Sequence, residues 1–379
     1  MTHSKPIHLM HIVDKLSMDG LNPNSCAILL KDWITHTDIG QYSITVCSFR
    51  ASDPGGKFLE KHGITVHYLG LGKYSPKNIN AICKLIEENK IDLVHLHGYS
   101  AANFGRIASR KKGISNIVHE HAVLKIRPHQ YIVDFLLRKH TNLAVTVSHA
   151  VKTFVIRGRS IPPSKIHVIG NGIKLEAFKK RGLPENEKFR SGLDIPENRR
   201  IVGTVTRLSS EKGTAIFIKA MPKIIAAFPD VFFLVVGDGP LRTQLKNLSE
   251  DLNLSKHLKF LGFRSDILAL LSIFDIHVLP SLSEGFSLSL VEAMAVGNAI
   301  VATRVGGMRE ILEDEKTGLF IPPNNTEALS EKVSFLLKNP REALKLSESA
   351  VHSSRRFGIQ SSADSLNRLY QQALEKPTR

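Results

Sequence analysis

Residues 276–297 read IHVLPSLSEGFSLSLVEAMAVG. The apolar run at 276–279 has the length of a buried strand, and the pattern predicts a helix that begins near Leu288. A serine-rich loop with Glu284 lies between them, and Glu292 falls about a turn inside the helix. A strand, a short polar loop and a helix in this order predict one unit of a parallel α/β sheet, with a ligand-binding loop at the carboxyl end of the strand.

The same alternation extends along the chain of 379 residues, which is too long for one ordinary domain. We expect strands at 7–13, 43–49, 64–69, 93–96, 116–120, 143–147 and 166–169, then at 201–206, 231–236, 258–261, 276–279, 299–303 and 319–321. The stretch 179–200 combines glycine, proline and charge, which is typical of a linker. The sequence therefore predicts an α/β protein with two Rossmann-like, doubly wound domains facing across a cleft, at 1–180 and 199–357, joined by a linker at 181–198.

The charge is distributed unevenly. Residues 1–183 hold 26 Lys and Arg against 12 Asp and Glu (+14), and residues 184–379 hold 25 against 23 (+2), which together give the net +16. A basic first half favours an anionic partner, such as a phosphorylated acceptor, an anionic membrane face or nucleic acid, although a merely solubilising surface would look the same. The three cysteines lack CxxC spacing, and neither a signal peptide nor a run of transmembrane length is apparent, so we expect a cytoplasmic protein.

Cations and glycines follow two strands of the second half. Arg207 and Lys212 lie in the loop after the strand at 201–206, beside an expected helix start, and two cations there suit a diphosphate. Gly237 and Gly239 allow a tight turn after the strand at 231–236. Each feature alone is equally typical of a solvated loop or a structural turn.

The two carboxylates of the opening segment lie on either side of a helix start. The amides of Gly285, Phe286 and Ser287 are expected to be free there and can bind phosphate. Glu284 and Glu292 could then each hold a hydroxylated ring, one on each side of a diphosphate. The alternative is that both simply place favourable charge near the first turns of the helix.

Together these segments resemble a known family. The chain has five motifs in the family's order and at its usual spacing: Gly203 to Arg207, Glu211-Lys212-Gly213, Val236 to Gly239, Glu284 to Glu292, and Val305-Gly306-Gly307. This pattern resembles the retaining glycosyltransferases of the GT-B fold, family 4, over nearly the whole chain. The resemblance implies a nucleotide-sugar donor in the second domain, an acceptor in the first, and a final helix at 358–379 that packs back on the first domain.

The resemblance also implies a role for each residue. Arg207 and Lys212 would bind the donor diphosphate, Glu284 the transferred sugar and Glu292 the ribose. The amides from Gly285 through Phe286 and Ser287 to Leu288, with the turn at Gly237 and Gly239, would face the diphosphate. Such enzymes usually need no metal, so we expect no cofactor.

The first domain offers a glycine loop and four histidines. The family often has a Gly-Gly pair after the first strand, where this chain has Asp19-Gly20; Gly20 keeps the flexible position, but the carboxylate of Asp19 would repel a phosphate.

His95 and His97 end one predicted strand, and His119 and His121 end the next. Residues two apart share a strand face, so all four could converge. No cysteine or carboxylate completes a tetrahedral metal site. The resemblance implies that His121, with His119 as the second match, points at the reacting sugar; packing histidines are the alternative.

These observations predict a retaining hexosyltransferase-like enzyme, with UDP as the expected base. It would act on a glycan or lipid-linked acceptor in cell-surface polysaccharide or glycolipid synthesis, with peripheral contact to the inner face of an anionic membrane through its basic domain. A nucleotide-sugar epimerase on the same fold is the main alternative. A catalytically silent binding subunit would not need the four charged residues, and a nucleic-acid binder would leave the second-half motifs unexplained.

Overall fold

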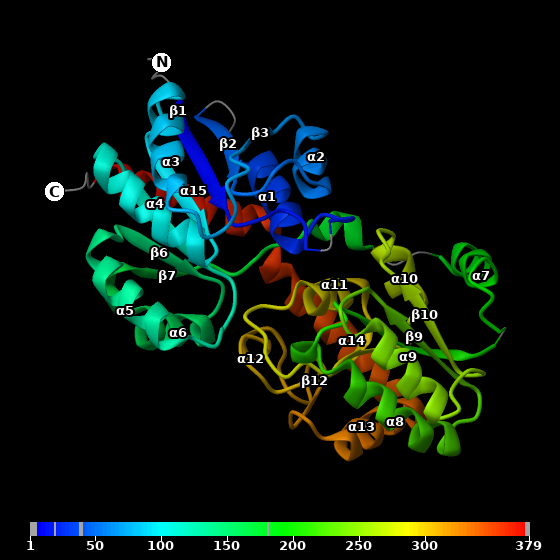
Figure 1. Ribbon diagram of the computed structural model, residues 1–379. Helices are drawn as coiled ribbons and strands as arrows, with labels where there is room; N and C mark the ends of the chain where they lie inside the picture. The colour runs from blue at the N-terminus through cyan, green and yellow to red at the C-terminus, as the bar shows by residue number, and fades with distance from the viewer. Residues whose placement is uncertain (1–5, 19, 38–40, 180–181, 197, 376–379) are drawn as a thin grey trace. The chain divides into compact units, whose positions relative to one another are not determined.

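The computed structural model describes residues 6–18, 20–37, 41–179, 182–196 and 198–375 (Figure 1). The chain divides into two compact units, each with its own parallel sheet. Unit 1 comprises Met1–Gly172 and Ile359–Arg379, and unit 2 comprises Ile173–Gly358. Within the described ranges, no helix is both long enough and apolar enough to cross a bilayer. Asp19 lies outside these ranges.

Unit 1 is built on a seven-stranded parallel sheet of order β3-β2-β1-β4-β5-β6-β7. Its strands are β1 (Ile7–Val13), β2 (Tyr42–Ser48), β3 (Thr65–Tyr68), β4 (Leu93–His97), β5 (Ser115–Glu120), β6 (Leu143–Thr146) and β7 (Ile166–Val168). The strand order reverses between β1 and β4, which pair in register from Leu9 with Leu93 to Val13 with His97. Ligands of open α/β sheets bind beyond the carboxyl ends of the strands at such a point.

The helices of unit 1 lie on both faces of its sheet (Figure 1). They are α1 (Ser25–His36), α2 (Pro54–Glu60), α3 (Lys77–Glu88), α4 (Tyr99–Lys112), α5 (Pro128–Leu137), α6 (His149–Arg159) and α15 (Ile359–Glu375), with short 3-10 turns η1 (Arg138–His140) and η2 (Pro163–Lys165). The final helix α15 packs on α1, β4 and β5 and buries Leu366, Leu369 and Tyr370. The core of unit 1 therefore includes residues from both ends of the chain.

Unit 2 is built on a six-stranded parallel sheet of order β10-β9-β8-β11-β12-β13. Its strands are β8 (Arg200–Val205), β9 (Val231–Val236), β10 (Leu258–Gly262), β11 (Ile276–Leu279), β12 (Ala299–Thr303) and β13 (Leu319–Ile321). Its helices are α7 (Leu183–Ser191), α8 (Thr214–Ala227), α9 (Arg242–Asp251), α10 (Ile267–Ile273), α11 (Leu288–Val296), α12 (Met308–Ile311), α13 (Thr326–Lys338) and α14 (Pro340–Ser354), with 3-10 turns η3 (Leu175–Phe178), η4 (Ser210–Lys212) and η5 (Arg355–Phe357).

Alternate residues of β9 show why this sheet is covered on both faces. Phe233 and Val235 join the core cluster that contains Phe217 of α8, whereas Phe232 and Leu234 join the cluster on the other face. Successive strand side chains point to opposite faces, so a continuously apolar strand must be buried on both sides. The expected pair of doubly wound parallel sheets is confirmed.

The predicted linker at 181–198 is wrong. It contains α7, which packs on α10, and Leu193 and Ile195, which follow α7, are buried in the core of unit 2. Pro184 and Gly192 indicated a break in the sequence, but they stand in the first turn of this helix and just after its end, where proline and glycine are also favoured. The units instead divide between Gly172 and Ile173.

Candidate functional site

Four loops at the carboxyl end of the unit 2 sheet are bonded directly to one another. They follow β9, β8, β11 and β12, which are consecutive in the sheet. The strand order reverses between β8 and β11, so the loops after these two strands meet at the switch point. Every second-half site segment predicted from the sequence lies in one of these loops or in the helix that follows it.

Lys212 and Glu284 form an ion pair across the switch point. The Nζ of Lys212 lies 2.7 Å from Oε1 of Glu284, and the hydroxyl of Ser281 donates to the same oxygen at 3.0 Å. The Glu284 side chain is 7% exposed and that of Lys212 is 24% exposed, so the ammonium reaches the surface while the carboxylate is enclosed. The two residues most expected to contact the donor therefore lie side by side.

The backbone holds the first two loops together. The amides of Leu282 and Ser283 donate to the carbonyl of Glu211 at 2.8 and 3.3 Å. Gly213 has φ +63, and a Cβ at this position would overlap the carbonyl oxygen of Pro280. Only glycine permits this approach, so Gly213 fixes how near Lys212 comes to the loop after β11.

The loop after β12 holds Glu284 from the other side. The amide of Gly307 donates to the carbonyl of Glu284 at 3.1 Å, and the hydroxyl of Thr303 donates to the carbonyl of Ser281. Gly306 has φ +47, and a Cβ there would overlap the carbonyl oxygen of Glu284. The main chain of Glu284 is thus packed against the Gly306-Gly307 turn.

The loop after β9 meets the residues that follow β8. Gly237 has φ +126, and a Cβ there would overlap the carbonyl oxygen of Thr206; a Cβ on Gly239 would overlap that of Leu208. The amide of Leu208 donates to the carbonyl of Asp238 at 3.0 Å. Arg207, between these contacts, has an exposed side chain. The glycines thus have a packing role that the sequence alone could not separate from phosphate binding.

Helix α11 begins beside the ion pair. Its N-cap is Ser287, whose hydroxyl accepts from the amide of Leu290. Within the described ranges, the amides of Gly285, Phe286 and Leu288 donate no hydrogen bond. Free amides at a helix start form an anion site. Glu292 lies in the second turn of this helix and is partly buried.

A buried histidine that the sequence reasoning missed fixes α11 to the sheet. His277 of β11 lies 3.1 Å from the hydroxyl of Ser289, which donates to the carbonyl of Val205 at 2.8 Å. Burial lowers the pKa of His277 from 6.5 to about 3, so this histidine stays neutral. Its position one residue after the start of β11, facing inward, gave no sequence signal of this role.

The predicted histidines of unit 1 do converge, and a fifth joins them. His11, His95, His97 and His119 are buried, and His121 is partly exposed just beyond β5. Nδ1 of His11 lies 2.9 Å from Nε2 of His97, whose Nδ1 lies 3.0 Å from Nε2 of His121. Hydrogen bonds thus join His11, His97 and His121 in a chain and His95 to His119 in a pair, and ring contacts between the two groups make one cluster of five.

Two large aromatic side chains enclose this histidine cluster. The indole of Trp33 stacks on His119 with ring centroids 5.2 Å apart, and the hydroxyl of Tyr370 lies 2.9 Å from Nδ1 of His95. Burial lowers the pKa of His11 to about 3 and that of His121 to about 4. The cluster is therefore neutral at ordinary pH.

Two groups in the cluster could hold a metal. One group is His11, His95 and His97, and the other is Cys26, His97 and His121; within each group the donor atoms lie within 4.8 Å of one another. The structure thus brings a cysteine to the histidines, which the sequence did not predict. Two nitrogens on one zinc ion would be about 3.4 Å apart, given tetrahedral bonds of about 2.1 Å. The nitrogens of His11 and His97 are 2.9 Å apart and those of His97 and His121 are 3.0 Å apart, which are shorter distances and are those of hydrogen bonds.

Gly20 lies in the loop after β1. It has φ +75, it is exposed, and its amide donates to the hydroxyl of Ser17 at 3.0 Å. That amide would have to leave Ser17 to bind a phosphate.

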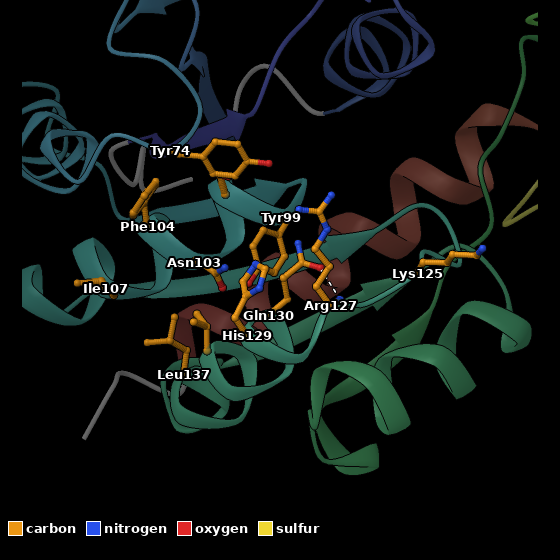
Figure 2. A pocket seen from close by; sticks show the side chains of 12 residues that line it. Tyr74, Tyr99, Asn103, Phe104, Ile107, Lys125, Arg127, His129, Gln130 and Leu137 are labelled. Atoms are coloured by element: carbon orange, nitrogen blue, oxygen red, sulfur yellow. Dashed lines mark hydrogen bonds between the residues drawn. The ribbon is translucent and has the colours of Figure 1, made fainter. Parts of the chain in front are cut away.

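Unit 1 also has a pocket that the sequence did not predict. It measures about 530 Å³ and lies between α4, α5 and the segment that contains Tyr74 (Figure 2). Tyr99, Phe104 and Val133 supply apolar surface to its lining. Its other side chains include Lys125, Arg127, His129, Asn103 and Gln130. An apolar pocket with cations at one end can hold an apolar group joined to an anionic one.

Comparison with known proteins places this chain in a class and then in a family. Residues 185–353 match the model for glycosyl transferases group 1, and residues 41–177 match that for glycosyltransferase family 4. The crystal structure of Anabaena Alr3699/HepE in complex with UDP superposes with a TM-score of 0.85 at 24% identity, covering 97% of this chain and all of that one. The fold is that of the GT-B glycosyltransferases.

Sequence relatives define the family. The Escherichia coli UDP-Gal:alpha-D-GlcNAc-diphosphoundecaprenol alpha-1,3-galactosyltransferase is 31% identical over 263 residues, which are 66% of this chain and 68% of that enzyme. The D-inositol 3-phosphate glycosyltransferase of Corynebacterium glutamicum is 30% identical over 56% of this chain, and the match spans about half (53%) of that relative. This chain belongs to glycosyltransferase family 4, as its motifs predicted.

Proposed function

We propose that this glycosyltransferase moves a sugar from a UDP-sugar to a hydroxyl of a lipid-linked glycan, with retention of configuration and without a metal ion. The observation that carries the proposal is the Lys212–Glu284 pair at the switch point, beside the free amides of α11. The names of two similar proteins support the choice of donor and acceptor. One is a UDP-Gal:alpha-D-GlcNAc-diphosphoundecaprenol galactosyltransferase, and the other was crystallised with UDP.

The ion pair gives two groups suited to opposite parts of a donor. The ammonium of Lys212 is the more exposed partner and would bind a diphosphate oxygen, together with the amides of Gly285, Phe286 and Leu288. The enclosed carboxylate of Glu284 would accept hydrogen bonds from hydroxyls of the transferred sugar. Exposed Arg207 would add a second cation, and Glu292 would hold the ribose.

The chemical step needs no protein nucleophile. The acceptor oxygen forms a bond to the anomeric carbon on the face from which the diphosphate leaves, and the bond between that carbon and the phosphate oxygen breaks. The electron pair goes to UDP, and the acceptor proton goes to the departing phosphate oxygen. Cations and helix amides stabilise the growing negative charge, so positioning and electrostatics supply the rate.

Unit 1 would supply the acceptor and a neutral hydrogen-bonding group. The cation-edged pocket beside α5 suits the diphosphate and first apolar carbons of a lipid-linked acceptor. With its Nε2 3.0 Å from His97, His121 has only Nδ1 for a sugar hydroxyl, and its lowered pKa keeps it uncharged. It would therefore orient the sugar rather than donate a proton.

The test combines nucleotide binding with one pair of lysine variants. We expect UDP at ~100 times its Kd to stabilise the wild type by ~2.7 kcal/mol, more than GDP or ADP at the same concentration. Lys212→Ala should lose most of this stabilisation and lower transfer by ~10²–10³-fold. Lys223→Ala, which breaks the exposed pair with Glu327 elsewhere in unit 2, should change neither.

Two outcomes would contradict this function. Unchanged transfer by Lys212→Ala would remove the ion pair from the mechanism. Conversion of the UDP-sugar to an epimerised sugar, at equal rates in the presence and absence of a polyprenyl-diphosphate acceptor, would favour the epimerase.

A further inference from the structure

Helix α5 has the reverse of the usual burial pattern of a surface helix. Of its ten residues, only Asp134 is buried. Ile132 and Leu136 are 59% and 64% exposed, and Tyr131 and Phe135 are 46% and 45% exposed. A helix on a globular domain normally turns its apolar side chains inward and its charges outward. The packing of unit 1 therefore does not explain the apolar residues of α5.

A buried charge network holds α5 in this orientation. The Asp134 carboxylate accepts from Arg106 at 2.9 Å and from Arg159 at 2.8 Å. Arg159 also donates to Glu120 at 3.1 Å. Because Asp134 faces inward to these two guanidinium groups, Ile132 and Leu136 are directed away from the domain.

The segment before the helix also exposes apolar side chains. Val123 and Leu124 are 39% and 48% exposed. These two residues, with Tyr131, Ile132, Phe135 and Leu136, are called here the α5 patch. Several large apolar side chains exposed together on one helix and the segment before it commonly mark a site of interaction.

The charge around the α5 patch identifies the kind of partner. Residues 98–165 contain twelve Lys and Arg and two carboxylates, a net charge of +10. Both carboxylates, Glu120 and Asp134, are already paired inside the arginine network. The surface next to the patch therefore has cations with no exposed carboxylate among these residues, including Lys125, Arg127 and Lys139.

This combination fits an anionic lipid surface. Aliphatic and aromatic side chains enter the boundary between headgroups and acyl chains, while surrounding cations bind lipid phosphates. Contact with a second copy would instead bring two strongly positive surfaces together. The pocket of Figure 2 shares α5 with the patch, since Val133 and Leu137 line it.

We propose that the α5 patch is the surface by which this protein binds an anionic lipid bilayer. One consequence of this proposal rests on the proposed function: a lipid-linked acceptor would enter the adjoining pocket directly from the bilayer.

Flotation with lipid vesicles tests the proposal. The probes are vesicles of phosphatidylcholine alone and of phosphatidylcholine mixed with phosphatidylglycerol, with the full chain as wild type and as Ile132→Ser/Leu136→Ser. Neither side chain lines the pocket. The matched control is Phe335→Ser/Leu344→Ser in unit 2, whose side chains are 44% and 59% exposed.

We expect the wild type and the control to float with the anionic vesicles and to bind less at high salt. The α5 variant should bind at least about tenfold more weakly, since two apolar side chains no longer leave water. Equal binding by the variant, or no binding by the wild type, would overturn the proposal. So would a wild-type dimer in sedimentation that the α5 variant loses, because the patch would then bind a second copy.

UDP-induced thermal stabilisation, measured on the same proteins, separates this proposal from the proposed function. It should be equal in all three. Vesicle binding without UDP stabilisation would contradict the donor assignment and leave the α5 patch intact, whereas UDP stabilisation without vesicle binding would contradict the patch alone.

Discussion

Acidification should destabilise unit 1 through its buried histidines. Burial lowers the pKa of His11 from 6.5 to about 3 and that of His121 to about 4. The folded state therefore stays neutral while the unfolded state takes up protons as the pH falls through 6.5. The stabilisation is complete above pH 6.5 and is lost progressively as the pH falls toward the folded-state values.

The size of the effect follows from these shifts. Between about pH 7.5 and 5.5, each of the two histidines should reduce the free energy of unfolding by about 1.4 kcal/mol, or about 3 kcal/mol for the pair. Burial also lowers the pKa values of His95, His97 and His119, which act in the same direction. Domains are stable by only ~5–15 kcal/mol, so this loss should be plainly measurable.

The chain provides its own probe of unit 1. Trp33 is its single tryptophan and stacks on His119 inside the histidine cluster. Urea unfolding followed by tryptophan fluorescence at several pH values therefore reports on unit 1. Urea suits this measurement because it is uncharged and leaves the ionic strength unchanged, whereas a denaturant that is a salt would raise it.

A single variant provides the control. His11→Asn removes one titrating ring, so the loss of stability between about pH 7.5 and 5.5 should shrink by about 1.4 kcal/mol relative to wild type. A wild-type unfolding midpoint that does not move with pH, or an identical pH dependence in the variant, would refute the reasoning.

Two further substitutions test how the loops and α5 are held. Gly306→Ala would press a Cβ onto the carbonyl of Glu284 at φ +47. In thermal unfolding we expect it to lower the free energy of unfolding by roughly 2–3 kcal/mol and to abolish the stabilisation by UDP. Gly192→Ala, at φ −65, should be nearly neutral. Asp134→Asn should cost unit 1 roughly 3–5 kcal/mol in urea unfolding by leaving Arg106 and Arg159 without their carboxylate. Glu87→Gln, in the exposed pair with Lys112, should cost under about 1 kcal/mol. A neutral Gly306→Ala, or equal losses in Asp134→Asn and Glu87→Gln, would contradict these assignments.

Periodicity predicted both sheets because every strand in them is locally apolar and bounded by turns. Local signals were ambiguous where proline and glycine occur. Pro184 and Gly192 suit a linker in composition, but they belong to the start and end of α7. Helices α2 and α14 also have a proline in the first turn, where it is compatible with a helix start as well as with a turn.

The donor-side residues were predictable because each follows a strand, and parallel strands bring their carboxyl ends to one edge. Their pairing was not predictable. That Lys212 bonds to Glu284, with Ser281 on the same oxygen, depends on the close approach of loops 72 residues apart in sequence.

Contacts between residues far apart in the sequence also determine the histidine cluster and the orientation of α5 in unit 1. His11 joins the histidine cluster from a strand 84 residues before His95, and Tyr370 joins it from the last helix. Which face of α5 is buried depends on Asp134 finding Arg106 and Arg159. No periodicity within the helix shows that.

The return of α15 to unit 1 has a consequence for biosynthesis. The indole nitrogen of Trp33 donates to the hydroxyl of Ser362, and that hydroxyl donates to the carbonyl of Gly170. When the ribosome has made the first 172 residues, the partner of Trp33 has yet to be translated. Unit 2 is continuous in sequence, so it can complete its core before the chain is finished. Although domains usually mature from the amino end onward, here the amino-terminal sheet should be the last to close.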